Sequence, residues 1–477
     1  MISFLISIVA LVLGYLIYGK VVERIFGPDE RQTPAIAHPD GVDYIALPTW
    51  KVFMIQFLNI AGTGPIFGAI MGAWFGPASF LWIVFGCIFA GSVHDYISGM
   101  MSLRNDGAGL PELVGKYMGK VMRIILLVFT MLLLLMVGAV FVYSPAMILS
   151  GIGGHVIIWF VVIFIYYIIA TLLPIDKIIG KVYPLFAFAL IFMAVGLFVC
   201  LLIKMPHIPE VWNIGGGMES WMTAQQSDGI DLLGVKAYLT KNTLFPAMFI
   251  TIACGAISGF HATQSTLMAR CLKSEKLGRP VFYGSMITEG FVALVWAAVS
   301  SWFFYSGGWR EVLPQDAVNE FLAQVGNTDG KTLIQYFPGP IVVKLVCSSW
   351  LGVVGGILAM LGVVAAPITS GDTALRSARL IIADFLKFDQ KPITKRLMIA
   401  VPMFAAVLGL LIWQMAYPNG FNVLWQYFGW SNQTLSVFTL WTATIFLYKY
   451  KKCYWITLIP AIFMTTVSLT FILQTIF

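Results

Sequence analysis

The chain has 477 residues, of which 59% are hydrophobic and only 11% are charged, and its mean hydropathy is +0.87. This composition excludes a soluble globular domain, because repeated apolar runs are each long enough to cross the ~30 Å hydrocarbon core of a bilayer. The net charge of +7 comes from basic residues in short loops between these runs, which is typical of a cytoplasmic membrane face and not of a nucleic-acid surface.

Twelve apolar segments have the length of a membrane-spanning helix, so we expect an all-α polytopic membrane protein. The first six are Ile2–Tyr18, Trp50–Trp74, Ala78–Met101, Met122–Ile148, Val156–Leu173 and Val182–Ile203. The second six are Thr243–Met268, Val281–Phe304, Ile341–Thr369, Leu397–Trp413, Val423–Tyr448 and Tyr454–Ile476. The first segment has neither a basic leader nor a small-residue cleavage site, so we interpret it as a retained helix and not as a signal peptide.

The basic residues lie mostly on one side of this plan. With the N-terminus outside, the loops after spans 1, 3, 5, 7, 9 and 11 face the cytoplasm and hold 23 of the 29 Lys and Arg residues. The opposite side holds the other six, which are Lys204, Lys236, Lys241, Arg310, Lys331 and Lys344. Because Lys and Arg are enriched in cytoplasmic loops, both termini are predicted to face outward. In the long outer loops, residues 229–241 and 315–325 resemble amphipathic helices over the outer mouth.

Span 2 contains the sequence NIAGTGPIFG, residues Asn59 to Gly68, near its midpoint. Gly62 and Gly64 tolerate irregular backbone, and Pro65 lacks an N–H and suits the first turn of a new helix. We therefore expect two half-helices that meet around Thr63. The alternative interpretation is a proline kink in an ordinary packed helix.

Span 7 is interrupted at a similar depth, where Gly255, Ser258, Gly259, His261 and Gln264 crowd its middle and inner half. Spans 2 and 7 enter the membrane from opposite sides, which predicts two five-helix repeats with inverted topology. Paired broken helices of this kind indicate the midplane binding site of a transporter. Freed N–H groups at a half-helix end suit an anionic substrate, and freed carbonyl groups suit a cation.

This repeat plan divides the chain into five parts. Residues 1–49 form an extra helix and a loop, 50–203 the first repeat, 204–242 an outer loop, 243–448 the second repeat and 449–477 a last extra helix. The nine predicted substrate-binding residues all lie in the two interruptions: Asn59, Gly62, Thr63, Gly64, Gly255, Ser258, Gly259, His261 and Gln264.

Three segments together resemble the carbon-starvation protein A (CstA) family: NIAGTGPIFG, FAGSVHDYISGMMSLRNDGAGLPELVGKYMG and SGFHATQS. The resemblance runs through nearly the whole chain. It implies a bacterial inner-membrane transporter of the amino acid–polyamine–cation superfamily, with the leucine-transporter-like fold. Members of the family are associated with uptake of peptides, or of pyruvate with protons, when carbon is scarce.

Ionisable residues at membrane depth are costly and are therefore functional candidates. Glu289 in span 8 is a candidate proton carrier, or else a neutral glutamate that holds helices together. His94 and Asp95 lie toward the cytoplasmic end of span 3 and, as neighbours, are not expected to bond each other. We expect Asp95 to pair with Arg104 or with the loop after span 9. His261 suits proton exchange near neutral pH.

Hydroxyl groups near the end of span 9 are candidates for a sodium position. In the leucine-transporter-like fold the eighth core helix supplies such hydroxyls, and by that resemblance Thr369 and Ser370 match. Asp372 and Arg376 follow at i, i+4, the spacing of an ordinary ion pair on a cytoplasmic turn. Asn432 in span 11 either lines the same cavity or links helices.

The sequence therefore favours a secondary active transporter that imports a small carboxylate-bearing nutrient, a peptide or pyruvate, with H⁺ or with Na⁺. The expected partners are this substrate, the coupling ion and the lipid bilayer, with no nucleic acid, cofactor or structural metal. A passive channel and a nutrient sensor are the alternatives. Metalloprotease, nucleotide-binding and hydrolase motifs do not occur in the sequence, so an enzyme is not expected. The six cysteines are scattered through apolar runs and are interpreted as free thiols.

Overall fold

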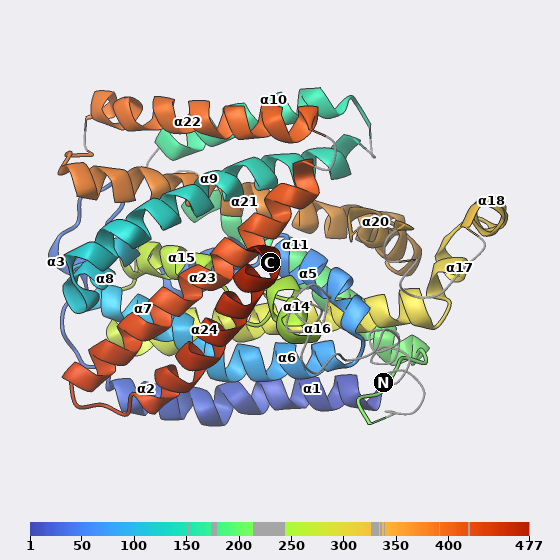
Figure 1. Ribbon diagram of the computed structural model, residues 1–477, viewed down its shortest axis with the longest axis horizontal. Coiled ribbons are helices and arrows are strands. Elements are labelled where there is room, and N and C mark those ends of the chain that lie inside the picture. The colour runs from blue at the N-terminus through green and yellow to red at the C-terminus, as the bar shows by residue number, and fades with distance from the viewer. Residues whose placement is uncertain are drawn as a thin grey trace.

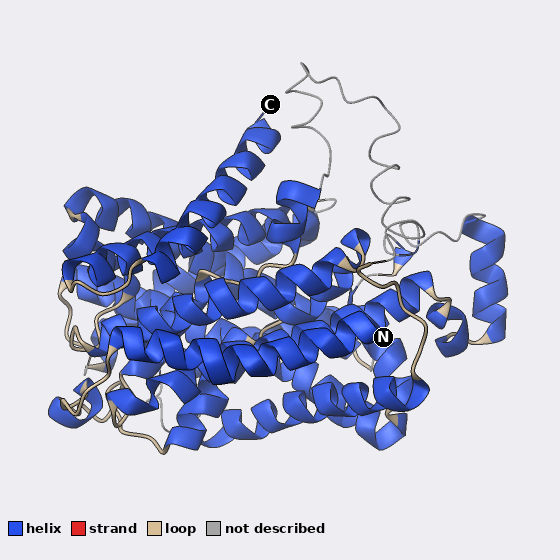
Figure 2. Ribbon diagram, turned by 90° about the horizontal axis from the view of Figure 1, so that it is seen from below, coloured by secondary structure: helices blue, strands red, loops and turns tan. Residues whose placement is uncertain are grey.

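The computed structural model describes residues 1–150, 153–172, 179–212, 244–325, 333, 336–337, 339–390, 392–417 and 420–476. Every regular element in these ranges is helical (Figures 1 and 2). The predicted amphipathic segment 229–241 and residues 213–242 of the outer loop lie outside the described residues. The other predicted outer helix is present as α18 (Gln315–Val325), which projects at the right-hand edge of Figure 1.

The first half of the chain contains fourteen helical elements in the described ranges. They are α1 (Ile2–Leu13), η1 (Gly14–Tyr18), α2 (Gly19–Phe26), α3 (Pro34–Ala37), α4 (Thr49–Ile60), α5 (Gly64–Gly72), η2 (Ala73–Phe75), α6 (Ala78–Phe85), η3 (Gly86–Gly91), α7 (Ser92–Leu103), α8 (Leu110–Met118), α9 (Lys120–Ser150), α10 (Val156–Leu172) and α11 (Ile179–Lys204).

The second half adds twelve described elements. They are α14 (Leu244–Thr251), α15 (Phe260–Ala269), η5 (Glu275–Leu277), η6 (Arg279–Tyr283), α16 (Gly284–Tyr305), α17 (Gly308–Val312), α18, α20 (Gly339–Trp350), α21 (Gly352–Leu386), α22 (Ile393–Ala416), α23 (Gly420–Lys449) and α24 (Trp455–Ile476). The helix axes run mostly along the long axis of the molecule in Figure 1.

Membrane-spanning length is reached by eight helices in the described residues, and the bent pair α4–α5 makes a ninth. The apolar helices α10 and α20 are shorter. The protein is therefore a multi-pass membrane protein, whereas the count of twelve spans stays a prediction. The broken span 2 is confirmed, because α4 and α5 meet at an angle of 45°. Span 7 is also interrupted, between the end of α14 and the start of α15.

Span 9 was predicted wrongly as one helix from Ile341 to Thr369. The structure has two helices there, α20 and α21, and Gly352 at the start of the second has a left-handed φ of 66°, which interrupts a continuous helix. Helix α21 then continues to Leu386. As a result Thr369 and Ser370 lie in the middle of a long helix and not at its end.

Three short π-helical turns meet on one side of the molecule. They are η1 between α1 and α2, η3 between α6 and α7, and η6 before α16. The Tyr283 hydroxyl of η6 donates to the Ile88 carbonyl of η3 at 2.9 Å. A Cβ on Gly14 of η1 would lie 2.6 Å from the Ile88 side chain. The wide turns therefore pack against one another at one level of the bundle.

Candidate functional site

The two broken helices touch where each is interrupted. A Cβ on Gly64, the first residue of α5, would lie 2.3 Å from Sγ of Cys254, which follows α14. One turn further along α5, a Cβ on Gly68 would lie 2.9 Å from the Thr251 carbonyl oxygen. These glycines let the two backbones approach more closely than larger residues would. The predicted interruptions thus form one continuous region.

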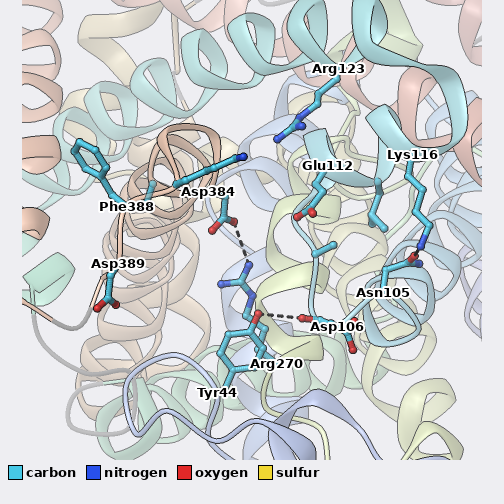
Figure 3. Close-up of a pocket in the computed structure, with 14 residues that line it drawn as sticks. Tyr44, Asn105, Asp106, Glu112, Lys116, Arg123, Arg270, Asp384, Phe388 and Asp389 are labelled. Atoms are coloured by element: carbon cyan, nitrogen blue, oxygen red, sulfur yellow. Dashed lines mark hydrogen bonds and ion pairs between the residues drawn. The ribbon is translucent and has the colours of Figure 1, made fainter.

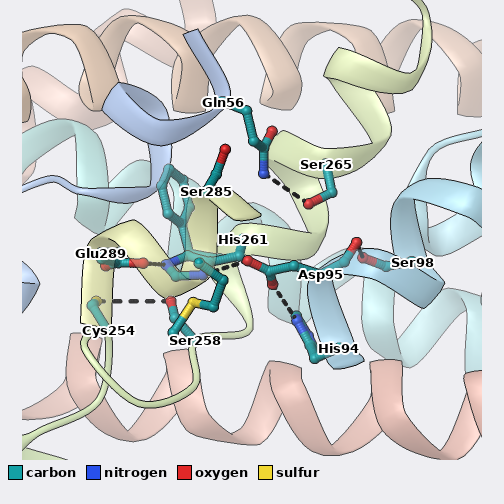
Figure 4. A network of polar contacts seen from close by, with 12 residues as sticks. Gln56, His94, Asp95, Ser98, Cys254, Ser258, His261, Ser265, Ser285 and Glu289 are labelled. Carbon is teal, nitrogen blue, oxygen red and sulfur yellow. Dashed lines mark hydrogen bonds and ion pairs between the residues drawn. The ribbon is translucent and has the colours of Figure 1, made fainter. Parts of the chain in front are cut away.

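A chain of buried ionisable groups lies beside this region (Figure 4). His261 of α15 places Nδ1 3.0 Å from Oδ2 of Asp95 on α7, and Nε2 3.5 Å from Oε2 of Glu289 on α16. His94 Nδ1 lies 2.7 Å from the other oxygen of Asp95. All four side chains are fully buried. The structure therefore brings together four predicted coupling residues from three separate helices.

The expected partners of Asp95 were wrong in two respects. His94 and Asp95 do contact each other, although adjacent residues point to different sides of a helix. Their short side chains turn toward each other at the seam with α15, where His261 also approaches Asp95. Arg104 instead forms an ion pair with Glu275 at 2.9 Å.

The hydrogen-bonding requirements of this cluster define its proton positions. An ionised carboxylate accepts hydrogen bonds only, so Asp95 favours a proton on Nδ1 of each histidine. The Nε2 atoms of His94 and His261 then carry lone pairs. Neither Nε2 atom, and neither oxygen of Glu289, has a hydrogen-bond partner in the described part of the chain. The cluster therefore offers positions at which a proton can bind and leave.

Further polar groups without partners lie on the adjoining faces of α4 and α15. Gln56 Nε2 donates to Ser265 Oγ at 3.0 Å and joins the two helices. One turn further along α4, both polar side-chain atoms of Asn59 lack partners among the described residues. The same is true of Thr63 Oγ1 and of Gln264 Oε1. Because buried polar atoms normally have hydrogen-bond partners, this group points to a ligand or to water.

The N-termini of the two half-helices differ. At α15, Asn432 of α23 accepts hydrogen bonds from Ser258 Oγ at 3.0 Å and from the Phe260 amide at 2.7 Å. This contact caps α15 and shows that Asn432 links helices, one of the two roles considered from the sequence. Gly259 allows the close approach, because a Cβ there would lie 2.3 Å from the Asn432 carbonyl oxygen. At α5, the N-cap Thr63 makes no side-chain capping bond.

The hydroxyl groups of α21 make different contacts. Ser370 Oγ donates toward the carbonyl oxygens of Asn59, at 2.8 Å, and Leu58, at 3.2 Å, at the end of α4. Thr369 Oγ1 contacts Ala365 O and Ala366 O of its own helix, at 3.0 and 2.9 Å. Of the two predicted sodium ligands, therefore, only Ser370 bridges to the first broken helix in this structure.

Asp372 and Arg376 do not lie on an exposed cytoplasmic turn, as their spacing suggested. Both are fully buried. The Tyr183 hydroxyl donates to Asp372, and Arg376 Nη1 lies 3.4 Å from Oδ1 of Asp43. Arg376 also donates to the Ala170 carbonyl oxygen at 2.6 Å. These residues therefore tie α21 to α11, to α10 and to the segment between α3 and α4.

Residues in and beside the predicted cytoplasmic loops line a charged vestibule (Figure 3). It has a volume of about 480 Å³, and Lys116, Arg123, Arg270 and Asp384 are among its lining residues. A narrower cavity of about 20 Å³ shares Arg270 and Asp384 with it and extends to Thr263. Thr263 lies on α15, the helix that also carries His261.

The two residues that line both cavities, Arg270 and Asp384, form an ion pair. Arg270 Nη2 lies 3.6 Å from Asp384 Oδ2, and Arg270 Nε donates to the Gly107 carbonyl oxygen at 2.9 Å. The guanidinium also stacks over the ring of Tyr44 at 5.1 Å. Sequence reasoning missed Arg270 and Asp384, because charged residues at helix ends resemble ordinary loop residues, and it missed Gln56, a single polar residue inside an apolar helix. Among the described residues, no group of three or more His, Cys, Asp and Glu side chains could hold a metal ion.

The family model described as carbon starvation protein CstA matches residues 1–154, 145–329 and 339–471. An uncharacterised membrane protein of Haemophilus influenzae is 43% identical over 348 residues, which cover 64% of this chain and 91% of that protein. A peptide transporter CstA of Campylobacter jejuni is 27% identical, over 96% of this chain and 77% of its own. The pyruvate/proton symporter BtsT of Escherichia coli is 28% identical, over 56% of this chain and 43% of its own.

Solved structures of two transporters share the fold. A Na⁺-coupled sialic acid symporter in a substrate-bound outward-open state matches with a TM-score of 0.54 and 13% identity, covering 100% of this chain and 98% of its own. A manganese transporter of Eremococcus coleocola matches with a TM-score of 0.56 and 13% identity, covering 92% and 90%. These likenesses confirm the leucine-transporter-like fold class. The exact layout of two five-helix repeats stays a prediction.

Proposed function

We propose, because this chain belongs to the carbon starvation protein CstA family, that it is a proton-coupled importer of a small carboxylate-bearing nutrient. The substrate is a peptide or pyruvate, the two substrates named for relatives. The membrane is the bacterial inner membrane, and import works by alternating access around the two broken helices. Induction under carbon starvation belongs to the same proposal.

The observation that carries the proposal is the position of His261 between two buried carboxylates. Asp95 holds one ring nitrogen as a donor, and the other faces Glu289 at 3.5 Å. One proton bound between Nε2 of His261 and Glu289 neutralises a charge that would otherwise be isolated at membrane depth. His261 lies on the broken helix α15, so movement of that helix changes the distance to Glu289 and with it the proton affinity.

The substrate carboxylate is assigned to the N-terminus of α5. At this end the side chain of the N-cap residue Thr63 makes no capping bond, and its hydroxyl has no partner among the described residues. Backbone N–H groups at a helix N-terminus bind anions. The equivalent amide of α15, at Phe260, is already occupied by Asn432. Asn59 and Gln264 supply further hydrogen bonds on either side.

Uptake into proteoliposomes tests proton coupling. One proton per substrate permits about tenfold accumulation for each unit of imposed pH difference. Glu289→Gln keeps shape and volume but cannot release a proton, so accumulation at one unit of pH difference should fall about tenfold, to simple equilibration, while counterflow exchange persists. His261→Gln should behave in the same way. Glu311→Gln, at an exposed glutamate of α17, is the matched control and should accumulate normally.

Three outcomes would contradict the proposal. Undiminished pH-driven accumulation by Glu289→Gln and His261→Gln would remove both residues as proton carriers. A wild-type protein that equilibrates substrate without accumulating it would be a channel. Loss of exchange together with accumulation would place Glu289 in substrate binding and not in coupling.

Sodium is the second candidate for the coupling ion, because Ser370 meets the carbonyl oxygens at the end of α4. A sodium ion at this point would be ligated by these carbonyls and by the hydroxyls of Ser370 and Thr369. Sodium coupling predicts uptake that follows a sodium gradient at constant pH and that fails in the Thr369→Ala and Ser370→Ala proteins. Proton coupling predicts no response to sodium.

A further inference from the structure

An apolar groove runs along the membrane-facing side of the bundle, away from the buried cluster. Its walls are α6 and η3 on one side and α24 on the other, with α14 at one end, and its volume is about 580 Å³. Exposed apolar side chains form its rim, among them Leu81, Phe85, Phe89, Trp455 and Ile459. Figure 1 shows α6 and α24 in the part of the bundle that also contains α1.

Trp82 lines the groove, and the one polar group of its side chain is already hydrogen-bonded. Its indole N–H already donates to the Ile252 carbonyl oxygen at 2.9 Å. Its ring centroid lies 4.7 Å from that of Phe249 and 5.7 Å from that of Phe463, and both of these rings also line the groove. The lining along α6 and η3 extends from Ala78 to Ala90, about 18 Å at the ~1.5 Å rise of a helix. This is the shape and chemistry of a channel for a hydrocarbon chain.

Lysine residues are close in sequence to the residues that line one end of the groove. Trp455, the first residue of α24, lines the groove, and the exposed Lys451 and Lys452 lie just before it in the turn that follows α23. Tyr18 lines the same end, and the exposed Lys20 follows it by two residues. Trp and Tyr are enriched at the level of the lipid headgroups, and lysines there attract anionic lipids.

We propose that this groove binds an anionic phospholipid, with an acyl chain along α6 and α24 and the phosphate headgroup on Lys451 and Lys452. Charge decides between this occupant and a second copy of the chain. A two-fold dimer with its axis along the membrane normal would place the lysines of one copy at the level of the same lysines of the other. Such a contact is repulsive, whereas an anionic headgroup neutralises the charge.

Binding to purified protein in detergent tests the site. Dioleoyl phosphatidylglycerol should be retained in native mass spectra and should raise the melting temperature more than dioleoyl phosphatidylcholine. The double variant Lys451→Gln/Lys452→Gln should bind phosphatidylglycerol about 25-fold more weakly, at about fivefold per lysine. Lys395→Gln, an exposed lysine at the start of α22, is the control and should bind like the wild type.

Two further experiments separate the contribution of the lipid headgroup from that of the acyl chain. Inorganic phosphate alone, and dihexanoyl phosphatidylglycerol, should stabilise the protein far less than the dioleoyl lipid, because neither fills the groove. Equal binding of the glycerol and choline lipids, equal binding by the double variant, or full stabilisation by phosphate or by the short lipid would each overturn the proposal. A dimer that forms through α24 and excludes lipid would overturn it as well. Counterflow exchange by the double variant verifies its fold.

Discussion

Nδ1 of His261 lies 3.0 Å from a carboxylate oxygen of Asp95, and both side chains are fully buried. The second oxygen of the same carboxylate contacts His94. Asp95 therefore orients two imidazole rings at once. A single change at this residue affects the tautomers of both rings and hence every proton position in the cluster.

Asp95→Asn should lower proton-driven accumulation about tenfold or more. The amide replaces one acceptor oxygen by a donor, so one of the two histidines must adopt the other tautomer. Loss of a hydrogen bond to a charged group also costs about 1.5–3 kcal/mol of stability. Accumulation and thermal unfolding measure the two effects. Ser98→Ala, which removes only a hydroxyl bonded to the Asp95 backbone carbonyl, is the control. Normal accumulation by Asp95→Asn would show that the carboxylate does not orient the cluster.

Gly64→Ala should impair both transport and folding, and Gly64→Leu more severely. The added Cβ would lie 2.3 Å from Sγ and 2.6 Å from Cβ of Cys254. The double variant Gly64→Ala/Cys254→Gly should therefore recover transport and stability, because truncation of Cys254 makes room for the added Cβ. Uptake and melting temperature are the measurements. Gly409→Ala, where a Cβ meets nothing within 4 Å, should be neutral. Failure of the double variant to recover would mean that Gly64 approaches substrate and not only the second helix.

Asp384→Asn should open the route from the vestibule to α15. The carboxylate of Asp384 is partly exposed, so its pair with Arg270 contributes at most about 1 kcal/mol and its loss should leave the fold intact. We expect up to about fivefold faster labelling of a Ser377→Cys reporter from the cytoplasmic side, because Ser377 lines the narrow cavity. The background carries Cys453→Ser, since Cys453 is exposed. Glu112→Gln, at another carboxylate of the vestibule, should leave the labelling rate unchanged.

Glu210 caps the start of α1, and its carboxylate should make the stability of the protein depend on pH. Partial burial opposes ionisation of Glu210, but hydrogen bonds from the Met1 amino group and from Ser3 outweigh it and lower the pKa to about 2. Because this value lies below the usual pKa near 4.5, the carboxylate stabilises the fold at neutral pH. That contribution is lost as pH falls from about 4.5 toward 2. Glu210→Gln should therefore melt lower than the wild type at pH 7, and the gap should close in acid. A gap that is constant with pH would contradict this assignment.

The sequence predicted the broken helices well because glycine and proline act locally. Pro65 and the flanking glycines predict where α4 ends and α5 begins, and a run of small polar residues predicts the gap before α15. The break at Gly352 was missed, because it lies in an apolar glycine-containing run that reads as continuous helix. The left-handed φ of Gly352 marks the break between α20 and α21 in the structure.

The side-chain partners could be predicted only in part. His261, Asp95 and Glu289 were identified as costly buried groups, but their contacts join three helices that are far apart in sequence. The contact of His94 with Asp95 depends on rotamers that helix geometry leaves open. Arg270 and Asp384 come together because α15 and α21 end at the same vestibule, which follows from tertiary packing alone.

The interlocked π-turns determine which parts of the buried cluster stay together. A slide of α7 past α16 by one turn, about 5.4 Å, would leave the Ile88 carbonyl without the Tyr283 hydroxyl in an apolar layer, a costly loss. Asp95 follows one of these turns and Glu289 follows another, so we infer that the two carboxylates keep a fixed distance during transport. His261 stands apart from them on the broken helix. In the proposed proton-coupled cycle, His261 would then approach and leave two carboxylates that keep their positions relative to each other.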